Sequence, residues 1–270
     1  MADWGKILSR GRVEDRRAMG PGAVGGGLGI AGLALVVLFN YFNTGQIDLG
    51  SVLNELQNVQ VRQDPSFNAA DFEGADSYEV FASTVVGSTN DLWGRVFAAQ
   101  NKTYQEPTLV LFRGGTQSAC GGASSQVGPH YCPLDGVIYL DETFFDQLQQ
   151  LGAQGDVAQA YVIAHEVGHN VQNQLGVLQA EHSQSDSIAV ELQADCYAGL
   201  WAYSIRDLGI FGPNEIREAI DAAAAVGDDR IQSAYVGRIT PETWTHGSSD
   251  QRVDAFTRGY TTGEVAACGQ

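Results

Sequence analysis

The segment from Tyr161 to His169 constrains this chain more than any other, because it places two histidines four residues apart with a glutamate directly after the first. Residues four apart lie on one face of an α-helix, one turn from each other. We therefore expect His165 and His169 to project side by side from a helix. The helix itself is indicated by apolar or small residues at steps of three and four, which would form one buried stripe: Val157, Tyr161, Ala164, Gly168, Val171 and Leu175.

This spacing is typical of a metal site. Two imidazoles one helical turn apart can bind a single zinc ion, and a carboxylate next to the first histidine can accept a proton from an attacking water. We therefore predict that His165 and His169 are ligands of Zn²⁺ and that Glu166 is a general base. The alternative is that both are ordinary histidines on the surface of a helix.

A catalytic zinc takes three protein ligands and keeps one position open, so a third ligand must follow downstream. The candidates are His182, Asp186, Glu191 and Asp195, whereas Leu175 excludes the pattern in which a third histidine follows His169 by six residues. Glu191 is favoured because Glu191 and Asp195 share one face of a predicted helix. One carboxylate can then bind the metal while Asp195 accepts the N–H of a ligating histidine. His182 is the second choice, and a solvated acidic face is the alternative for both carboxylates.

A second feature is the apolar run from Ala23 to Phe39, which lies in a stretch without charge between Arg17 and Asp48. About twenty residues of helix cross a hydrocarbon core of roughly 30 Å. We therefore predict a transmembrane anchor over residues 21–42; a cleaved signal peptide is the alternative, but no small-x-small cleavage site follows. Five basic residues precede the run, and the positive-inside rule then keeps the N-terminus in the cytoplasm and the body outside it.

These features predict four parts: a cytoplasmic head (1–20), the anchor (21–42), a polar linker (43–70) and one domain (71–270). Within the domain, helical spacing runs over 77–100, as one kinked helix or two short ones, and β-branched runs predict strands over 108–112 and 137–140. From Asp141 onwards the pattern is mostly helical. The expected fold class is α+β, a mostly helical domain with a small sheet, preceded by one transmembrane helix.

The charge and the cysteines bear on partners and compartment. A net charge of −17 repels phosphate and argues against a nucleic-acid partner. Four cysteines suit an exported domain, because an oxidising compartment allows two disulfides. Cys120 and Cys132 would close a short loop, while Cys196 and Cys268 would tie a late helix to the C-terminus. The other pairings and buried free thiols stay open, and so does the oligomeric state.

Several runs together resemble the neutral zinc metallopeptidase family of membrane-anchored bacterial proteins. The resemblance spans nearly the whole chain. The Glu-x-x-Ala-Asp element is also similar to that of the membrane zinc proteases that process prenylated proteins. The runs that carry the resemblance are Arg10–Arg17, Tyr131–Pro133, Ile138–Asp141, Ala164–Gln172, Glu191–Cys196, Thr245–Ser249 and Gln251–Arg252.

The resemblance implies a zincin-like fold and a gluzincin-like site with His165, His169 and Glu191 as zinc ligands. It implies a zinc metalloendopeptidase whose substrate is an extracytoplasmic protein or peptide. His246, outside the motif helix, is a candidate donor to the developing oxyanion; Tyr197 and Tyr235 are rivals, and a purely structural histidine is the alternative. A different class of function is also open: a non-catalytic envelope scaffold or partner-binding protein whose zinc is only structural, with His182 as fourth ligand. The strand over 137–140 is the expected sheet edge for an extended substrate.

Overall fold

The computed structural model describes residues 2–18, 76–124, 128–179 and 183–269, and the predicted anchor (21–42) and linker (43–70) lie outside these residues. Among the described residues, no helix combines the length and the apolar character needed to cross a membrane. The described elements are β1 (Arg12–Asp15), α3 (Ser77–Ala99), β2 (Thr108–Phe112), β3 (Gly115–Ser118), β4 (Gly121–Ser124), β5 (His130–Cys132), β6 (Val137–Asp141), α4 (Phe144–Gln150), α5 (Asp156–Gln174), α6 (Gln184–Ile205), α7 (Pro213–Ala225), α8 (Asp228–Tyr235) and α9 (Ser249–Thr262).

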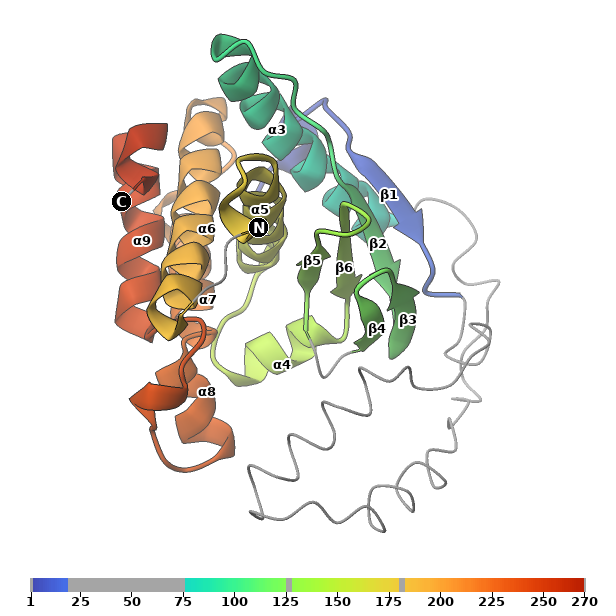
Figure 1. Ribbon diagram of the computed structural model, residues 1–270. Helices are drawn as coiled ribbons and strands as arrows, with labels where there is room; N and C mark the ends of the chain where they lie inside the picture. Colours follow the sequence, from blue (N-terminus) through green and yellow to red (C-terminus); the bar gives the residue numbers. More distant parts are fainter. Residues whose placement is uncertain (1, 19–75, 125–127, 180–182, 270) are drawn as a thin grey trace.

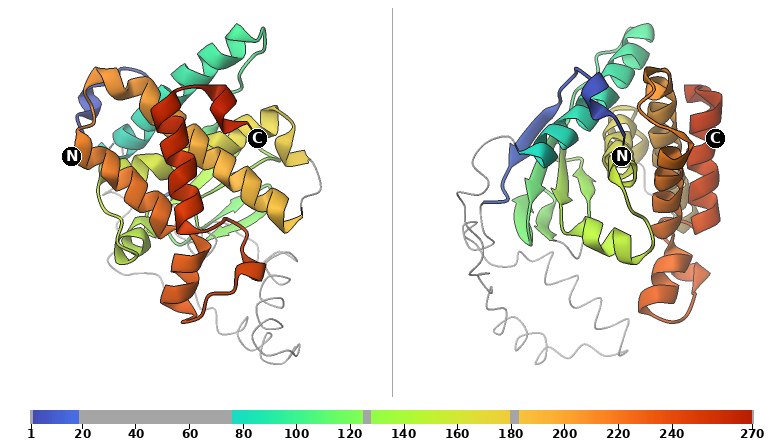
Figure 2. Two further views of the ribbon diagram at one scale, coloured as in Figure 1. Left: turned by 90° about the vertical axis from the view of Figure 1, so that its left-hand side faces the viewer. Right: turned by 180° about the vertical axis from the view of Figure 1, so that it is seen from behind.

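The main sheet has the order β1-β2-β6-β5, in which the first three strands are parallel and β5 is antiparallel. Helices pack against one of its faces, with α5 nearest the sheet and α6 and α9 farther out (Figure 1). Figure 2 shows the same layers from two other sides. The α+β fold class is confirmed, and so are the two predicted strands and the long helix, which is a single α3.

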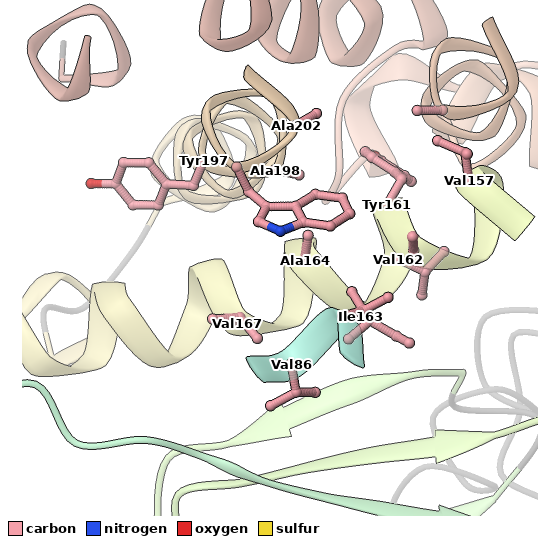
Figure 3. Close-up of a cluster of buried hydrophobic side chains, with 14 of the residues drawn as sticks. Val86, Val157, Tyr161, Val162, Ile163, Ala164, Val167, Tyr197, Ala198 and Ala202 are labelled. Atoms are coloured by element: carbon pink, nitrogen blue, oxygen red, sulfur yellow. The ribbon is translucent and has the colours of Figure 1, made fainter. Parts of the chain in front are cut away.

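Successive side chains of β2 and β6 point to opposite faces of the sheet, and both faces are covered. Both strands therefore look continuously apolar in sequence. Leu109 and Leu111 face the large core under the helices, whereas Val110 and Phe112 belong to a small second core beside the β3–β4 hairpin. Figure 3 shows how α5 fills the large core, with Ala164 lying toward α6 and Val167 toward α3 and the sheet.

Two disulfides fasten the two sides of the fold. Cys120–Cys132 joins the hairpin region to β5, and Cys196–Cys268 joins α6 to the C-terminal residues. The pairing expected from the sequence is therefore confirmed over the alternatives.

The expectation of a separate head over residues 1–20 is wrong for residues 2–18. Residues Arg12–Asp15 form the edge strand β1, whose residues pair in register with Thr108 to Leu111 of β2. The backbone groups of β1 find their hydrogen-bond partners in β2, which belongs to the rest of the domain. The head therefore completes the sheet instead of forming a separate part.

The expectation that the strand over 137–140 is a sheet edge is also wrong. β6 lies between β2 and β5, because it pairs in parallel with the former and antiparallel with the latter. The outer strand on that side is the three-residue β5, whose short run gives almost no periodicity to detect in sequence.

Candidate metal centre

The predicted motif helix is α5, and it is buried on nearly all sides. It crosses α6 closely at Gly168, where an added Cβ would lie 3.1 Å from the Cα of Ala194. A side chain at position 168 would push the helices apart, so the glycine of the motif serves the packing. This close crossing brings the histidines of α5 to the carboxylate of α6.

Three side chains that could bind a metal ion converge at this crossing. His165 Nε2 lies 3.2 Å from Glu191 Oε2, and His169 Nε2 lies 3.4 Å from Glu191 Oε1. The three side chains together offer donor atoms within 4.8 Å of one another. In the part of the chain that the structure describes, no other group of histidine, cysteine and acidic side chains converges in this way. The structure thus brings together the three ligands expected from the sequence.

The opposite nitrogen of each ring has a fixed partner. His165 Nδ1 lies 2.8 Å from Asp195 Oδ1, and His169 Nδ1 lies 2.8 Å from Gln172 Oε1. Both partners are acceptors, so each Nδ1 donates its proton outward and each Nε2 is left facing the point of convergence. The predicted contact between Asp195 and a histidine of the motif is present, whereas the role of Gln172 had no counterpart in the sequence analysis.

Glu166 is buried beside the two histidines, with 6% of its surface exposed. Its Oε2 atom is buried and has no hydrogen-bond partner among the described residues. A buried acceptor without a partner is costly in a structural role, so it indicates a group that works on a bound molecule.

Charge at the centre is balanced between acids and imidazoles. Burial raises the pKa of Glu191, but the nearby His169 and His165 lower it more, so the net pKa is well below its usual range. Burial lowers the pKa of His165, yet Asp195 and Glu191 raise it to about 10. Without a metal this centre therefore holds protons on nitrogen, and a divalent cation would replace them.

His246 lies in a loop that packs against α6 near Glu191. An added Cβ on Gly247 would lie 3.2 Å from Ile188 Cγ2, one turn before Glu191. His246 Nδ1 lies 3.2 Å from Asp228 Oδ1, and about half of the histidine side chain is exposed. The other Asp228 oxygen accepts the backbone N–H groups of residues 245–247 at 2.7 to 3.0 Å. Asp228 thus holds both the loop and the ring.

The rivals for these roles lie elsewhere. Tyr197 is buried against Trp93 in the core, with ring centroids 4.8 Å apart, and Tyr235 is exposed at the end of α8. Asp186 caps the start of α6 through a reciprocal hydrogen bond with Ser183. His182 lies outside the described residues.

Sequence reasoning missed several residues that support the centre. The only signal for three of them was that they are polar residues in helices that otherwise look buried, or that they stand inside runs resembling the family, whereas Asp228 begins the exposed helix α8 and had no such signal. These residues are Tyr161, Gln172, Asp228 and Arg252.

Comparison with known proteins agrees with this geometry. The model of the family described as "Putative neutral zinc metallopeptidase" matches residues 2–270, so the chain belongs to that family. It is 40% identical to the uncharacterized protein YpfJ of Escherichia coli (strain K12) over 273 residues, covering 95% of this chain and 94% of the relative. It is 42% identical to the uncharacterized protein Rv2575 of Mycobacterium tuberculosis (strain ATCC 25618 / H37Rv) over 242 residues, 82% of each chain. No solved structure matches the chain.

Proposed function

We propose that this protein is a zinc-dependent endopeptidase that hydrolyses peptide bonds of an extracytoplasmic protein or peptide. One observation carries the proposal: two imidazole Nε2 atoms and the Glu191 carboxylate face one another while the buried Glu166 Oε2 beside them has no partner. Family membership supports the same conclusion.

The donor set suits zinc. Two neutral imidazoles and one carboxylate from two helices are a common ligand set of catalytic zinc, and three ligands leave room for a fourth. When bound, zinc would act as a Lewis acid on the substrate carbonyl and would lower the pKa of a coordinated water. His165, His169 and Glu191 would hold it, and Asp195 and Gln172 would keep the rings in the required tautomer.

The remaining residues handle protons and charge. Glu166 would accept the proton of the attacking water and pass it to the leaving amine. His246, oriented by Asp228 through its Nδ1 atom, would with protons on both nitrogens donate from Nε2 to the oxygen that gains negative charge during attack. In this role His246 needs no contact with the metal ligands themselves.

An extended substrate would add to the sheet at β5, the outer strand beside α5, through main-chain hydrogen bonds. Asn173 of α5 donates to the Tyr131 hydroxyl of β5 at 3.0 Å, which fixes this strand along the motif helix. This replaces β6 as the substrate strand.

Two disulfides support a location of the domain outside the cytoplasm, since such bonds persist in oxidising compartments. Attachment to a membrane through residues 21–42 is part of the proposal.

The test is the substitution Glu166→Gln, with the exposed Glu264→Gln as matched control. We expect Glu166→Gln to keep the zinc content of the wild type and to lower kcat/KM on casein and on quenched fluorescent peptides by about 10²–10⁴-fold. Loss of zinc in this variant would make Glu166 a ligand, and unchanged hydrolysis would refute its role. A wild-type protein that binds zinc but cleaves none of these substrates would instead favour the structural-zinc scaffold.

A further inference from the structure

Arg252 lies on α9, 57 residues beyond Asp195 in sequence, yet its guanidinium is buried and forks onto that carboxylate. Its Nε donates to Asp195 Oδ2 at 2.8 Å and its Nη2 donates to Asp195 Oδ1 at 2.9 Å. Two parallel bonds of this kind fix both the position and the plane of a carboxylate. Asp195 itself is completely buried.

The carboxylate passes this orientation to the metal centre. Asp195 Oδ1 also accepts the hydrogen bonds of His165 Nδ1 and of the Tyr161 hydroxyl. Arg252 Nη2 lies 3.3 Å from the same hydroxyl, so the four groups close one buried network. Arg252 therefore reaches the ring that offers Nε2 to the metal through Asp195, and its Nη2 also lies 3.4 Å from His165 Nδ1 directly.

The fold holds Arg252 rigidly in this place. A Cβ added to Gly199 of α6 would lie 2.0 Å from the carbonyl oxygen of Phe256, and one added to Gly259 of α9 would lie 2.0 Å from that of Cys196. The two helices thus touch through their backbones, one turn from Asp195. The start of α9, the helix that carries Arg252, is also fixed, because Ser248 and Gln251 cap it with reciprocal hydrogen bonds.

We propose that Arg252 is a positioning residue of the metal centre: through Asp195 it sets the orientation of His165, and so the direction of the Nε2 lone pair. This inference rests on the proposed metal site but concerns metal binding and not cleavage. Arg252 touches neither metal nor substrate.

The test compares Arg252→Met and Arg252→Lys with Arg258→Met, which changes an exposed arginine of the same helix. Zinc affinity is measured by competition with a chelating dye, and ligand geometry by the visible spectrum of the cobalt-substituted protein. We expect Arg252→Met to weaken zinc binding by about tenfold to a hundredfold and to change the cobalt spectrum. The zinc affinity of Arg252→Lys should lie between those of the wild type and Arg252→Met, because lysine keeps the charge but cannot make the two parallel hydrogen bonds.

Wild-type affinity and an unchanged cobalt spectrum in Arg252→Met would overturn the inference. If Arg252→Met does not fold, Arg252→Lys decides the same question against Arg258→Met. A wild-type chain that binds zinc and cleaves nothing would refute the proposed peptidase while these affinities still test Arg252.

A separate observation concerns the two ends of residues 19–75. Arg17 Nη2 lies 2.9 Å from Asp76 Oδ2, so the residues that flank this segment form an ion pair. Gly11 packs backbone to backbone on α3, where its N–H donates to Ser83 O at 2.7 Å and an added Cβ would lie 2.9 Å from Gly87 N.

The first residues are anchored in the same domain. The Trp4 ring packs near Trp201 and Phe211, and its Nε1 donates to Asp156 Oδ2 at 2.7 Å, at the start of α5. A single crossing of a bilayer would separate the flanks by roughly 30 Å, which these contacts forbid. From 43 to 75 the sequence has no second uncharged run of membrane length to bring the chain back.

We infer that the head and the domain lie on the same side of any membrane to which the chain is attached, in place of the cytoplasmic head and outside domain expected from the sequence. Single cysteines placed at Leu8 and at Asp207, both exposed, test this in cells with a maleimide that does not cross membranes. The expected result is that both are labelled or both are protected until the cells are permeabilised. Labelling of only one position in intact cells would overturn the inference.

Discussion

The sheet side and the helical side of this molecule each contain a buried arginine and a disulfide, but they use them differently. On the sheet side, Arg17 gathers carboxylates from separate segments: Asp15 of β1, Asp76 before α3 and Glu142 after β6. On the helical side, Arg252 holds the single carboxylate of Asp195. The same ion-pair chemistry therefore fixes chain segments in one region and the direction of one imidazole in the other.

The difference follows from what surrounds each guanidinium. The partners of Arg17 keep some exposure, at 14% to 35% of the side chain, so water still shares in their solvation. Asp195 has none, and every one of its hydrogen bonds must come from the protein. A shift of Arg252 would therefore reach the metal centre, whereas a shift of Arg17 would reach the docking of residues 2–18.

The largest contrast is expected from the disulfides. Cys196 and Cys268 are 72 residues apart and Cys120 and Cys132 only 12, and the longer loop loses more chain entropy when it is closed. Replacing the Cys196–Cys268 pair by alanines should lower the free energy of unfolding by about 4.5 kcal/mol, against about 3 kcal/mol for the other pair. Urea unfolding of both double variants measures this. An equal or reversed loss would show that native contacts, not loop length, set the effect.

Arg17→Met should lower the free energy of unfolding by about 3 kcal/mol, because it removes the buried counter-charge shared by three partly buried carboxylates, of which Glu142 keeps Arg113 as a partner. Exposed Arg95→Met on α3 is the control. Zinc affinity of the folded Arg17→Met chain should equal that of the wild type, as measured by dye competition. A large loss of affinity would mean that the sheet side and the metal centre are coupled.

Within the metal centre, Glu191→Gln should weaken zinc binding by more than about a hundredfold and Asp195→Asn by about tenfold to a hundredfold. The order reflects a direct ligand against a residue that holds a ligand. Zinc titrations of the two purified variants decide it. The opposite order would exchange the two roles, and if neither mattered while His182→Ala did, Glu191 would be the wrong third ligand.

The smallest expected effect is a change in the free energy of unfolding at acidic pH. Burial raises the pKa of Asp228, but hydrogen bonds from His246 and its loop lower it more, so the net pKa lies below its ordinary value of 3.8. A carboxyl with a lowered folded pKa stabilises the protein above about pH 4, and this contribution is lost as the pH falls below that value. Asp228→Asn should therefore cost up to about 1 kcal/mol at pH 6 and less at pH 3. Urea midpoints at both values measure it; a difference that grows toward pH 3 would contradict the sign.

Much of the site was predictable because its signals are local. The histidines four apart define one helix face, and so do the carboxylates four apart. The uninterrupted apolar strands indicate a sheet covered on both sides. Arg252 and Asp228 were not predictable, because each acts across a contact between elements distant in sequence, whereas Gln172 lies one turn from His169 in α5 and only the side-chain geometry shows their contact. The arginine and the carboxylate it holds are 57 residues apart, and no period links them.

The sequence by itself determined the motif helix, the candidate ligands and the α+β class, since periodicity and spacing depend only on neighbours along the chain, whereas the structure decided the cysteine pairing among the open alternatives. Only the tertiary structure decided that residues 2–18 complete the sheet and that β5 is its outer strand. A short segment of four residues, such as Arg12–Asp15, does not form a strand from its own propensity, and its state is fixed by the partner strand β2 and by the close crossing with α3. Long-range packing of this kind leaves no periodic trace in the sequence.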